Sequence, residues 1–153
     1  MPSPFDRTVD AAFGAMKPAK DLRKVPDVLR NIAMVHAGQG IIDNGGLQYF
    51  FEQDFPGNPP YALFVEAYRA IGAVNVAVAL ERAVALFPFE DPHKHRKKRD
   101  HFLDSFNDDE GNERKSPFEP FTRQICGNKD VWPLLKQYVK SNAKQLRELQ
   151  RNS

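Results

Sequence analysis

The stretch IIDNGGLQYFFEQDF, residues 41–55, decides how this chain folds. Two consecutive glycines, Gly45 and Gly46, follow Asn44 and are followed at once by an apolar, largely aromatic run. Glycine and asparagine accept positive φ at little steric cost, which suits the end of a helix. We therefore predict a sharp corner between two helices at Asn44-Gly45-Gly46, with positive φ at Gly45. A second helix beginning near Gly46 would bury one face, formed at spacings i, i+3 and i+4 by Leu47, Phe50 and Phe51.

The same glycines could instead form an anion site, because backbone amides at a helix N-terminus attract phosphates. A phosphate-binding loop normally carries Lys, Ser or Thr beside its glycines, and residues 41–55 contain none of these. We therefore favour the structural corner over the anion site.

Composition indicates an ordinary globular protein. The 153 residues are 41% hydrophobic and 27% charged, which predicts one domain over residues 1–153. The single cysteine, Cys126, excludes an internal disulfide and fits a reducing compartment. The N-terminus lacks the apolar core of a signal peptide, and no apolar run is long enough to span a membrane. We expect a cytoplasmic protein that has no membrane partner.

Hydrophobic spacing is helical almost throughout and predicts an all-α, single-domain bundle of about six helices. Gly72 reads as the C-terminal break of one helix, and the apolar stripe within 73–87 predicts the central, most buried helix. Residues 107–117 form a predicted polar loop. A long helix at about 130–151 ends the chain. A helix opening at Pro26 carries on one face Leu29, Ile32, Ala33 and His36.

The Asn-Gly-Gly stretch resembles a bacterial family of small helical domains that includes a DNA-mimic protein. The resemblance covers about residues 26–90, and more weakly the C-terminal helix. It departs at Leu47, where the family usually has Phe, and at Tyr49, where it usually has Gln. The resemblance implies an all-helical fold without known catalysis. The matching residues are Asn44, Gly45, Gly46, Leu47, Phe50 and Phe51, followed by Ile71, Gly72 and Ala73.

The DNA-mimic role does not follow from this resemblance. Mimicry requires carboxylates spread over a surface like the phosphates of a duplex. This chain has a net charge of +2, and residues 91–153 carry 14 Lys and Arg against 10 Asp and Glu. A partner is therefore not expected to bind this protein as a substitute for DNA.

Two basic patterns lie in the C-terminal part. We interpret the run 93–99 as a solvated basic face, since such runs usually have that meaning. His93 and His95 would diverge on a helix, so no metal site is expected. The second pattern is a stripe on the last helix, which is either an exposed outer face or a dock for an acidic partner or nucleic acid. It consists of Lys136, Lys140, Lys144, Arg147 and Arg151.

Candidate catalytic groups are scattered. Cys126 has no histidine nearby in sequence, and His36 lies on an apolar helical face, which favours a hydrogen-bonded core histidine. Asp43 and Glu52 could form a carboxylate pair near the corner, although Asp43 is equally a turn residue. Without a recognised enzyme motif, neither catalysis nor a cofactor is expected.

These observations favour a protein that binds another protein, as a regulator or an inhibitor. One alternative is an immunity protein that neutralises a toxin. The other is a nucleic-acid-binding protein that uses the basic C-terminal part, a function for which the stripe lacks interleaved stacking aromatics.

Overall fold

A computed structural model describes residues 1–107, 110 and 115–151. The described residues form eight α-helices and two short 3-10 helices, Leu22–Lys24 and Pro92–Lys94. The all-α prediction is confirmed for this part of the chain. Residues 108–109 and 111–114 of the predicted loop 107–117 lie outside it. The α-helices are α1 (Pro4–Met16), α2 (Asp27–Glu52), α3 (Tyr61–Ala70), α4 (Val74–Val84), α5 (Arg96–Asp104), α6 (Glu119–Ile125), α7 (Val131–Ser141) and α8 (Ala143–Arg151).

The predicted count of about six helices is wrong, because α1 and α6 were not predicted and the C-terminal helix is divided. The α1 helix begins with a capping box, in which Ser3 Oγ accepts from the Asp6 amide and the Asp6 carboxylate accepts from the Ser3 amide. Pro4 occupies the first turn, where its missing N–H costs nothing. Among the described residues, no helix is both long enough and apolar enough to cross a membrane.

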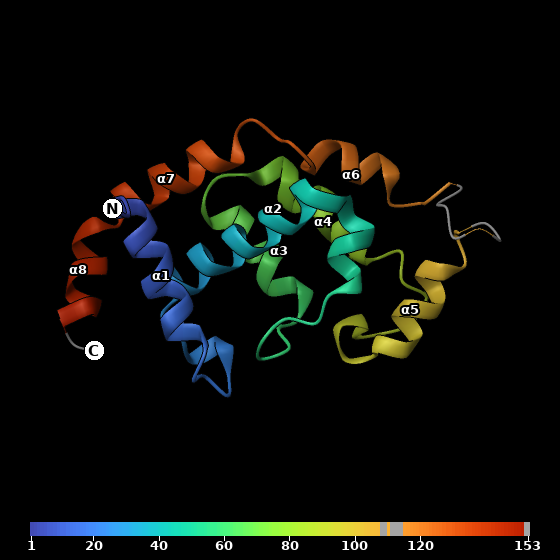
Figure 1. Ribbon diagram of the computed structural model, residues 1–153, viewed down its shortest axis with the longest axis horizontal. Coiled ribbons are helices and arrows are strands. Elements are labelled where there is room, and N and C mark those ends of the chain that lie inside the picture. The colour runs from blue at the N-terminus through green and yellow to red at the C-terminus, as the bar shows by residue number, and fades with distance from the viewer. Residues whose placement is uncertain (108–109, 111–114, 152–153) are drawn as a thin grey trace.

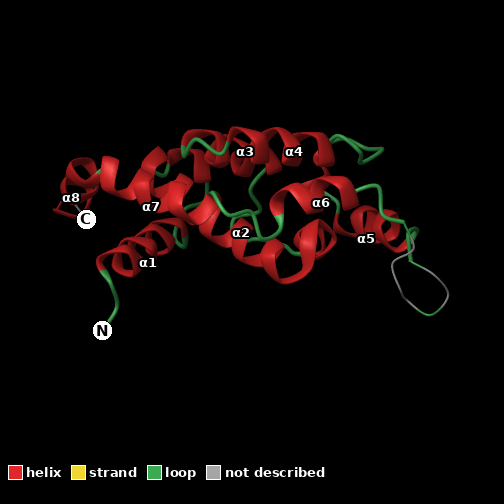
Figure 2. Cartoon of the chain, turned by 90° about the horizontal axis from the view of Figure 1, so that it is seen from above, coloured by secondary structure: helices red, strands yellow, loops and turns green. Residues whose placement is uncertain are grey.

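The helix α2 lies at the centre of the molecule (Figure 1). It packs against α1, α3, α5, α6 and α7, while α4 packs mainly against α3 and α6. The helices α3 and α4 run along one side of α2, as seen from above in Figure 2. The prediction that residues 73–87 form the central helix is therefore wrong. One side of α4 faces solvent, where Val74 and Glu81 are exposed.

The predicted corner is present within α2, at Gly46. Its backbone has φ +74° and ψ −171°, and the helix bends sharply there. The expectation of positive φ at Gly45 is wrong, since Gly46 is the residue that adopts it. Gly45 is required for a different reason, because a Cβ there would come within 2.6 Å of Tyr49 Cβ.

Beyond the corner, α2 supplies the aromatic centre of the core. Leu47, Phe50 and Phe51 are all fully buried, as predicted. The Phe51 ring packs edge-to-face on Phe87, with centroids 4.9 Å apart, and lies 5.0 Å from the Phe118 ring. The bend thus brings the end of α2 against the segments after α4 and before α6.

Gly72 ends α3 as the sequence predicts. It has φ +92°, and its amide donates to the Arg69 carbonyl over 3.1 Å. The next amide, of Ala73, donates to the Tyr68 carbonyl over 2.9 Å. This pair of hydrogen bonds is the Schellman arrangement, which satisfies the last carbonyls of the helix.

The long helix predicted over 130–151 is wrong, because the chain breaks at Asn142 into α7 and α8. The Asn142 side-chain amide donates to the Tyr138 carbonyl over 2.7 Å, and its backbone leaves helical geometry at φ −109° and ψ 16°. In Figure 1, α7 runs along the top of the molecule and α8 turns down from its end, beside α1. The turn buries Leu146, which is 4% exposed.

Candidate partner-binding groove

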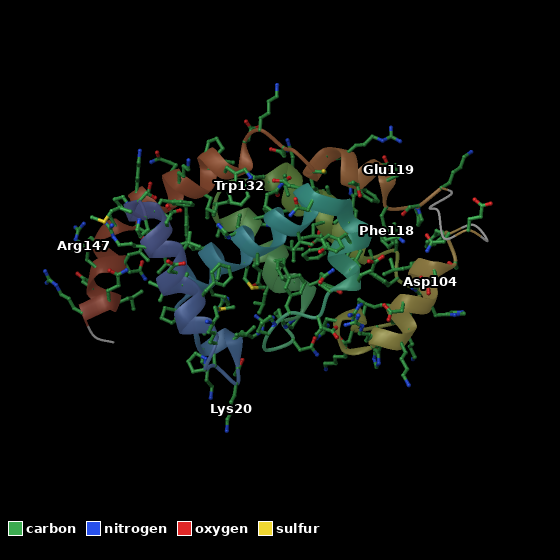
Figure 3. All side chains as sticks on the ribbon, viewed as in Figure 1. Lys20, Asp104, Phe118, Glu119, Trp132 and Arg147 are labelled. Carbon is green, nitrogen blue, oxygen red and sulfur yellow. The ribbon has the colours of Figure 1, made fainter. Side chains whose placement is uncertain are left out.

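A groove of about 370 Å³ lies between α1, α7 and α8. It is at the end of the molecule opposite α5, where Figure 3 labels Arg147. Its position depends on the capped start of α1 and on the break at Asn142, which carries α8 away from the line of α7. The lining residues are Pro4, Phe5, Thr8, Lys136, Val139, Lys140, Ala143, Leu146, Arg147 and Gln150.

The floor of the groove is apolar. Phe5, Val139 and Ala143 are half-buried, and Leu146 belongs to the hydrophobic core. Three cationic side chains, Lys136, Lys140 and Arg147, lie around this floor. The Lys136 ammonium lies 5.8 Å from the centroid of the Phe5 ring, within cation–π range.

The structure divides the predicted basic stripe into two groups. Lys136, Lys140 and Arg147 line the groove, whereas Lys144 and Arg151 do not. The chain also leaves helical geometry at Asn142, between Lys140 and Lys144.

The ion pairs of the described residues are made by six arginines outside the stripe and by none of the lysines. In the described part of the chain, no ion pair involves any of the five. By contrast, Arg69 pairs with Glu81 and Arg123 pairs with Glu119. Asp6 on α1 interacts electrostatically with Lys136, but the pKa of Asp6 is lowered mainly by its hydrogen bonds with Ser3.

A second polar cluster lies near the corner and links several elements of the fold. Gln39 is fully buried, and its amide donates to Asp43 Oδ1 over 2.7 Å and to the Ile125 carbonyl over 2.8 Å. The Tyr68 hydroxyl donates to Gln39 Oε1 over 2.9 Å, and burial raises the pKa of Tyr68. These bonds join α2 to α3 and to the end of α6.

Asp43 is exposed and takes part in this cluster through both carboxylate oxygens. It also accepts from the Gly127 amide over 2.8 Å, in the segment between α6 and α7, and from Trp132 Nε1 on α7 over 3.1 Å. The suggested carboxylate pair with Glu52 is not formed, since the described partners of Asp43 are the donors Gln39, Gly127 and Trp132. Glu52 is exposed at the far end of α2, beyond the bend.

The interpretation of residues 93–99 as a solvated basic face is wrong for Arg99, which is 1% exposed. Its guanidinium donates to the carbonyls of Phe51, Pro92 and His93 over 2.9–3.1 Å. It also pairs with Asp54 over 2.6 Å. Arg99 thus fastens α5 to the C-terminal end of α2, where helix carbonyls lack partners. A single arginine within a polar run gives no sequence signal that it is buried.

Asp54 also forms an ion pair with Arg96, whose Nη1 lies 2.8 Å from Asp54 Oδ2. Hydrogen bonds from Arg96 and then from Arg99 lower the pKa of Asp54. The exposed remainder of the run includes Lys94, Lys97 and Lys98, for which the prediction of a solvated face is confirmed.

The remaining candidate catalytic residues do not meet. His36 is half-buried between the rings of Phe13 and Trp132, with centroids 5.7 and 5.3 Å away, and burial lowers its pKa. The described residues give its ring no hydrogen bond, contrary to the expectation. The Cys126 thiol lies 3.8 Å from the Asp43 carbonyl. The described residues contain no group of three His, Cys, Asp or Glu side chains placed to hold a metal.

Comparison with known proteins identifies the family. No curated protein and no solved structure matches the chain. A family described as DMP19-like protein matches residues 23–142, which include the corner, the aromatic core, the Gly72 turn and α7. The matched segment ends at the break at Asn142, so α1 and α8, which form two sides of the groove, lie outside it. Because this match spans most of the sequence, the chain belongs to the DMP19-like protein family.

Proposed function

We propose that this protein is a non-catalytic binding module that regulates or inhibits a partner protein. The groove between α1, α7 and α8 carries the proposal, because it combines an apolar floor with cations that have no ion pair in the described chain. Protein interfaces typically have an apolar centre inside a polar rim.

The absence of catalysis is part of this proposal. It is supported by the structural use of the groups with the most suitable chemistry. Asp43 holds Gln39, Gly127 and Trp132, and the Arg99 guanidinium holds backbone carbonyls and Asp54. These contacts give both groups a role in holding the fold together.

Although the family resemblance includes a DNA-mimic protein, we do not propose that this protein mimics DNA. The net charge is +2 and the groove is bordered by cations, which would repel a DNA-binding surface. An inhibitor that covers a partner surface, including an immunity protein that covers a toxin, remains consistent with the groove.

Affinity capture from the native host tests the proposal. The tagged full chain is incubated with lysate treated with DNase and RNase, and captured proteins are identified by mass spectrometry. The candidate partner is then purified and mixed with the chain, and the complex is examined by size-exclusion chromatography and calorimetry. We expect a stoichiometric complex from the two purified proteins. If proteins are captured only from lysate that has not been treated with nuclease, the result contradicts the proposal and favours the nucleic-acid-binding class.

A further inference from the structure

We infer that the groove between α1, α7 and α8 receives an acidic amphipathic helix of a partner protein. This inference rests on the proposed protein-binding function and adds the chemistry of the partner. Three features of the groove carry it: the spacing of the lining residues, their charge and their position relative to the core.

The shape of the groove fits a helix. On α7 and α8 the lining residues recur at helical spacing, so they form one continuous strip across the break. The strip is faced by the first two turns of α1, which contribute Pro4, Phe5 and Thr8. The nine residues of α8 span about 13 Å at 1.5 Å per residue, a length that two to three turns of a bound helix would match.

The chemistry of the floor requires an apolar stripe on the bound helix. Phe5, Val139, Ala143 and Leu146 offer ring and aliphatic carbon, and an amphipathic helix presents residues at i, i+3, i+4 and i+7 to such a surface. Leu146 belongs to the hydrophobic core, so the floor of the groove is in place before a helix binds.

The charge of the rim selects acidic residues on the bound helix. Lys136, Lys140 and Arg147 have no ion pair within the described residues, and all three have exposed side chains. Carboxylates flanking an apolar stripe would reach these cations at the edges of the groove, where charge pairs give specificity and faster association. On the α1 side Asp6 interacts electrostatically with Lys136, whereas the three cations that line the groove all lie on α7 and α8.

The same geometry disfavours nucleic acid and membranes. Lys144 and Arg151 do not line the groove, so only three of the five stripe cations border it and could contact a phosphate backbone there. Membrane insertion needs protruding apolar side chains, whereas Leu146 is buried and Phe5 is half-buried beside Lys136.

The test uses a fluorescently labelled synthetic peptide of about 16 residues, with leucine at i, i+3, i+4 and i+7 and glutamate at the flanking positions. A matched peptide carries lysine in place of glutamate. Binding to the full chain is measured by fluorescence anisotropy at about 150 mM salt. We expect the acidic peptide to bind and the basic peptide to fail.

Two double variants provide the control within the chain. Lys140→Ala with Arg147→Ala removes two rim cations, and Lys144→Ala with Arg151→Ala removes the same two residue types outside the groove. The net charge changes equally in both variants. We expect the rim variant to weaken peptide binding about tenfold and the control variant to change it less than about twofold.

A third variant, Ala143→Glu, places a carboxylate inside the groove. Position 143 is the first residue of α8, where the helix dipole favours an acidic side chain, so the fold should be retained. We expect binding of the acidic peptide to be lost. Circular dichroism of each variant verifies folding, and the two double variants decide the matter if Ala143→Glu unfolds.

Three results would overturn the inference. The first is no binding of the acidic peptide, and the second is equal weakening by the two double variants. The third is groove-dependent binding of duplex DNA, or of phosphatidylserine vesicles, in place of the peptide. If a captured partner protein binds the wild type and the rim variant equally, the groove assignment fails while the protein-binding function stands.

Discussion

Replacing Gly46 with alanine tests whether the bend in α2 is the element on which the fold depends. The backbone there has φ +74° and ψ −171°, a combination that only glycine adopts readily. An added Cβ would also lie 2.9 Å from Thr122 Cγ2 on α6, closer than real Cβ contacts allow. Backbone strain of roughly 1–3 kcal/mol adds to a packing cost of similar size. We expect Gly46→Ala to lower the free energy of unfolding by about 2–6 kcal/mol.

The matched control is Gly40→Ala, in the same helix. Gly40 lies among helical residues, its φ is not positive, and no neighbouring atom lies within 4 Å of the position that an added methyl group would take. Alanine is the better helix former, so this substitution should raise stability by about 0.5–1 kcal/mol. The same chemical change earlier in the helix is thus expected to have the opposite sign.

A second substitution separates the two costs at Gly46. Thr122→Ser removes the methyl group that an added Cβ would meet, but keeps the hydroxyl that accepts the Leu47 amide over 3.2 Å. In this background Gly46→Ala should lose the packing cost and retain the backbone strain of roughly 1–3 kcal/mol. A double-mutant cycle gives the difference directly.

Equilibrium unfolding in urea measures the wild type and each of these variants, with thermal unfolding as a check. For a domain of this size, each kcal/mol corresponds to roughly 2–4 °C in Tm. If Gly46→Ala and Gly40→Ala change the free energy of unfolding by the same amount, positive φ is not the reason that position 46 needs glycine. An unchanged penalty in the Thr122→Ser background would refute the steric part of the reasoning.

Other parts of the molecule give three more predictions. Arg99→Met should lower the free energy of unfolding by about 1–3 kcal/mol, because it leaves the buried Phe51 carbonyl without its donor. Arg96→Met removes an exposed partner of the same Asp54 and should cost below about 1 kcal/mol; equal losses in chemical unfolding would contradict the burial argument. Burial lowers the pKa of His36 in the folded state below 6.5, so the unfolded state binds more protons and stability should fall as the pH drops through and below 6.5. His36→Phe should make stability depend less on pH between about pH 7 and 5 in unfolding experiments. An unchanged pH dependence would mean that other groups cause it. Elemental analysis of protein purified without a histidine tag should find no stoichiometric metal, and bound zinc would instead make residues 91–104 a candidate site.

The corner and the helix ends were predictable because local rules govern them. Glycine at Gly46 and Gly72 marks positive φ, which is a property of the residue and its neighbours in sequence. The sequence did not distinguish Gly45 from Gly46, because both satisfy the same turn chemistry. In the structure Gly46 is the glycine with positive φ, and Thr122 packs against it from a helix about 75 residues later in the chain.

The candidate site was predictable in part. Helical spacing identified the five basic residues of the stripe, and the structure brings together three of them. The apolar floor was missed, because Phe5 and Leu146 are isolated in sequence and meet through tertiary packing. A signal for α1 was nevertheless present in Ser3 and Asp6, whose spacing and the intervening proline are typical of a capped helix start.

By itself, the sequence determined the all-helical character, the bend in α2, the Gly72 turn and the aromatic face that the bend buries, since each depends on backbone preference or on hydrophobic period. Tertiary structure decided which helix lies at the centre, which arginine is buried and where the last helix breaks relative to α1. Those outcomes depend on the donors, acceptors and apolar surface that distant segments supply to one another. Nothing in the sequence distinguishes Arg99 from Arg96. In the structure Arg99 is buried and donates to a carbonyl at the end of α2, whereas Arg96 stays exposed.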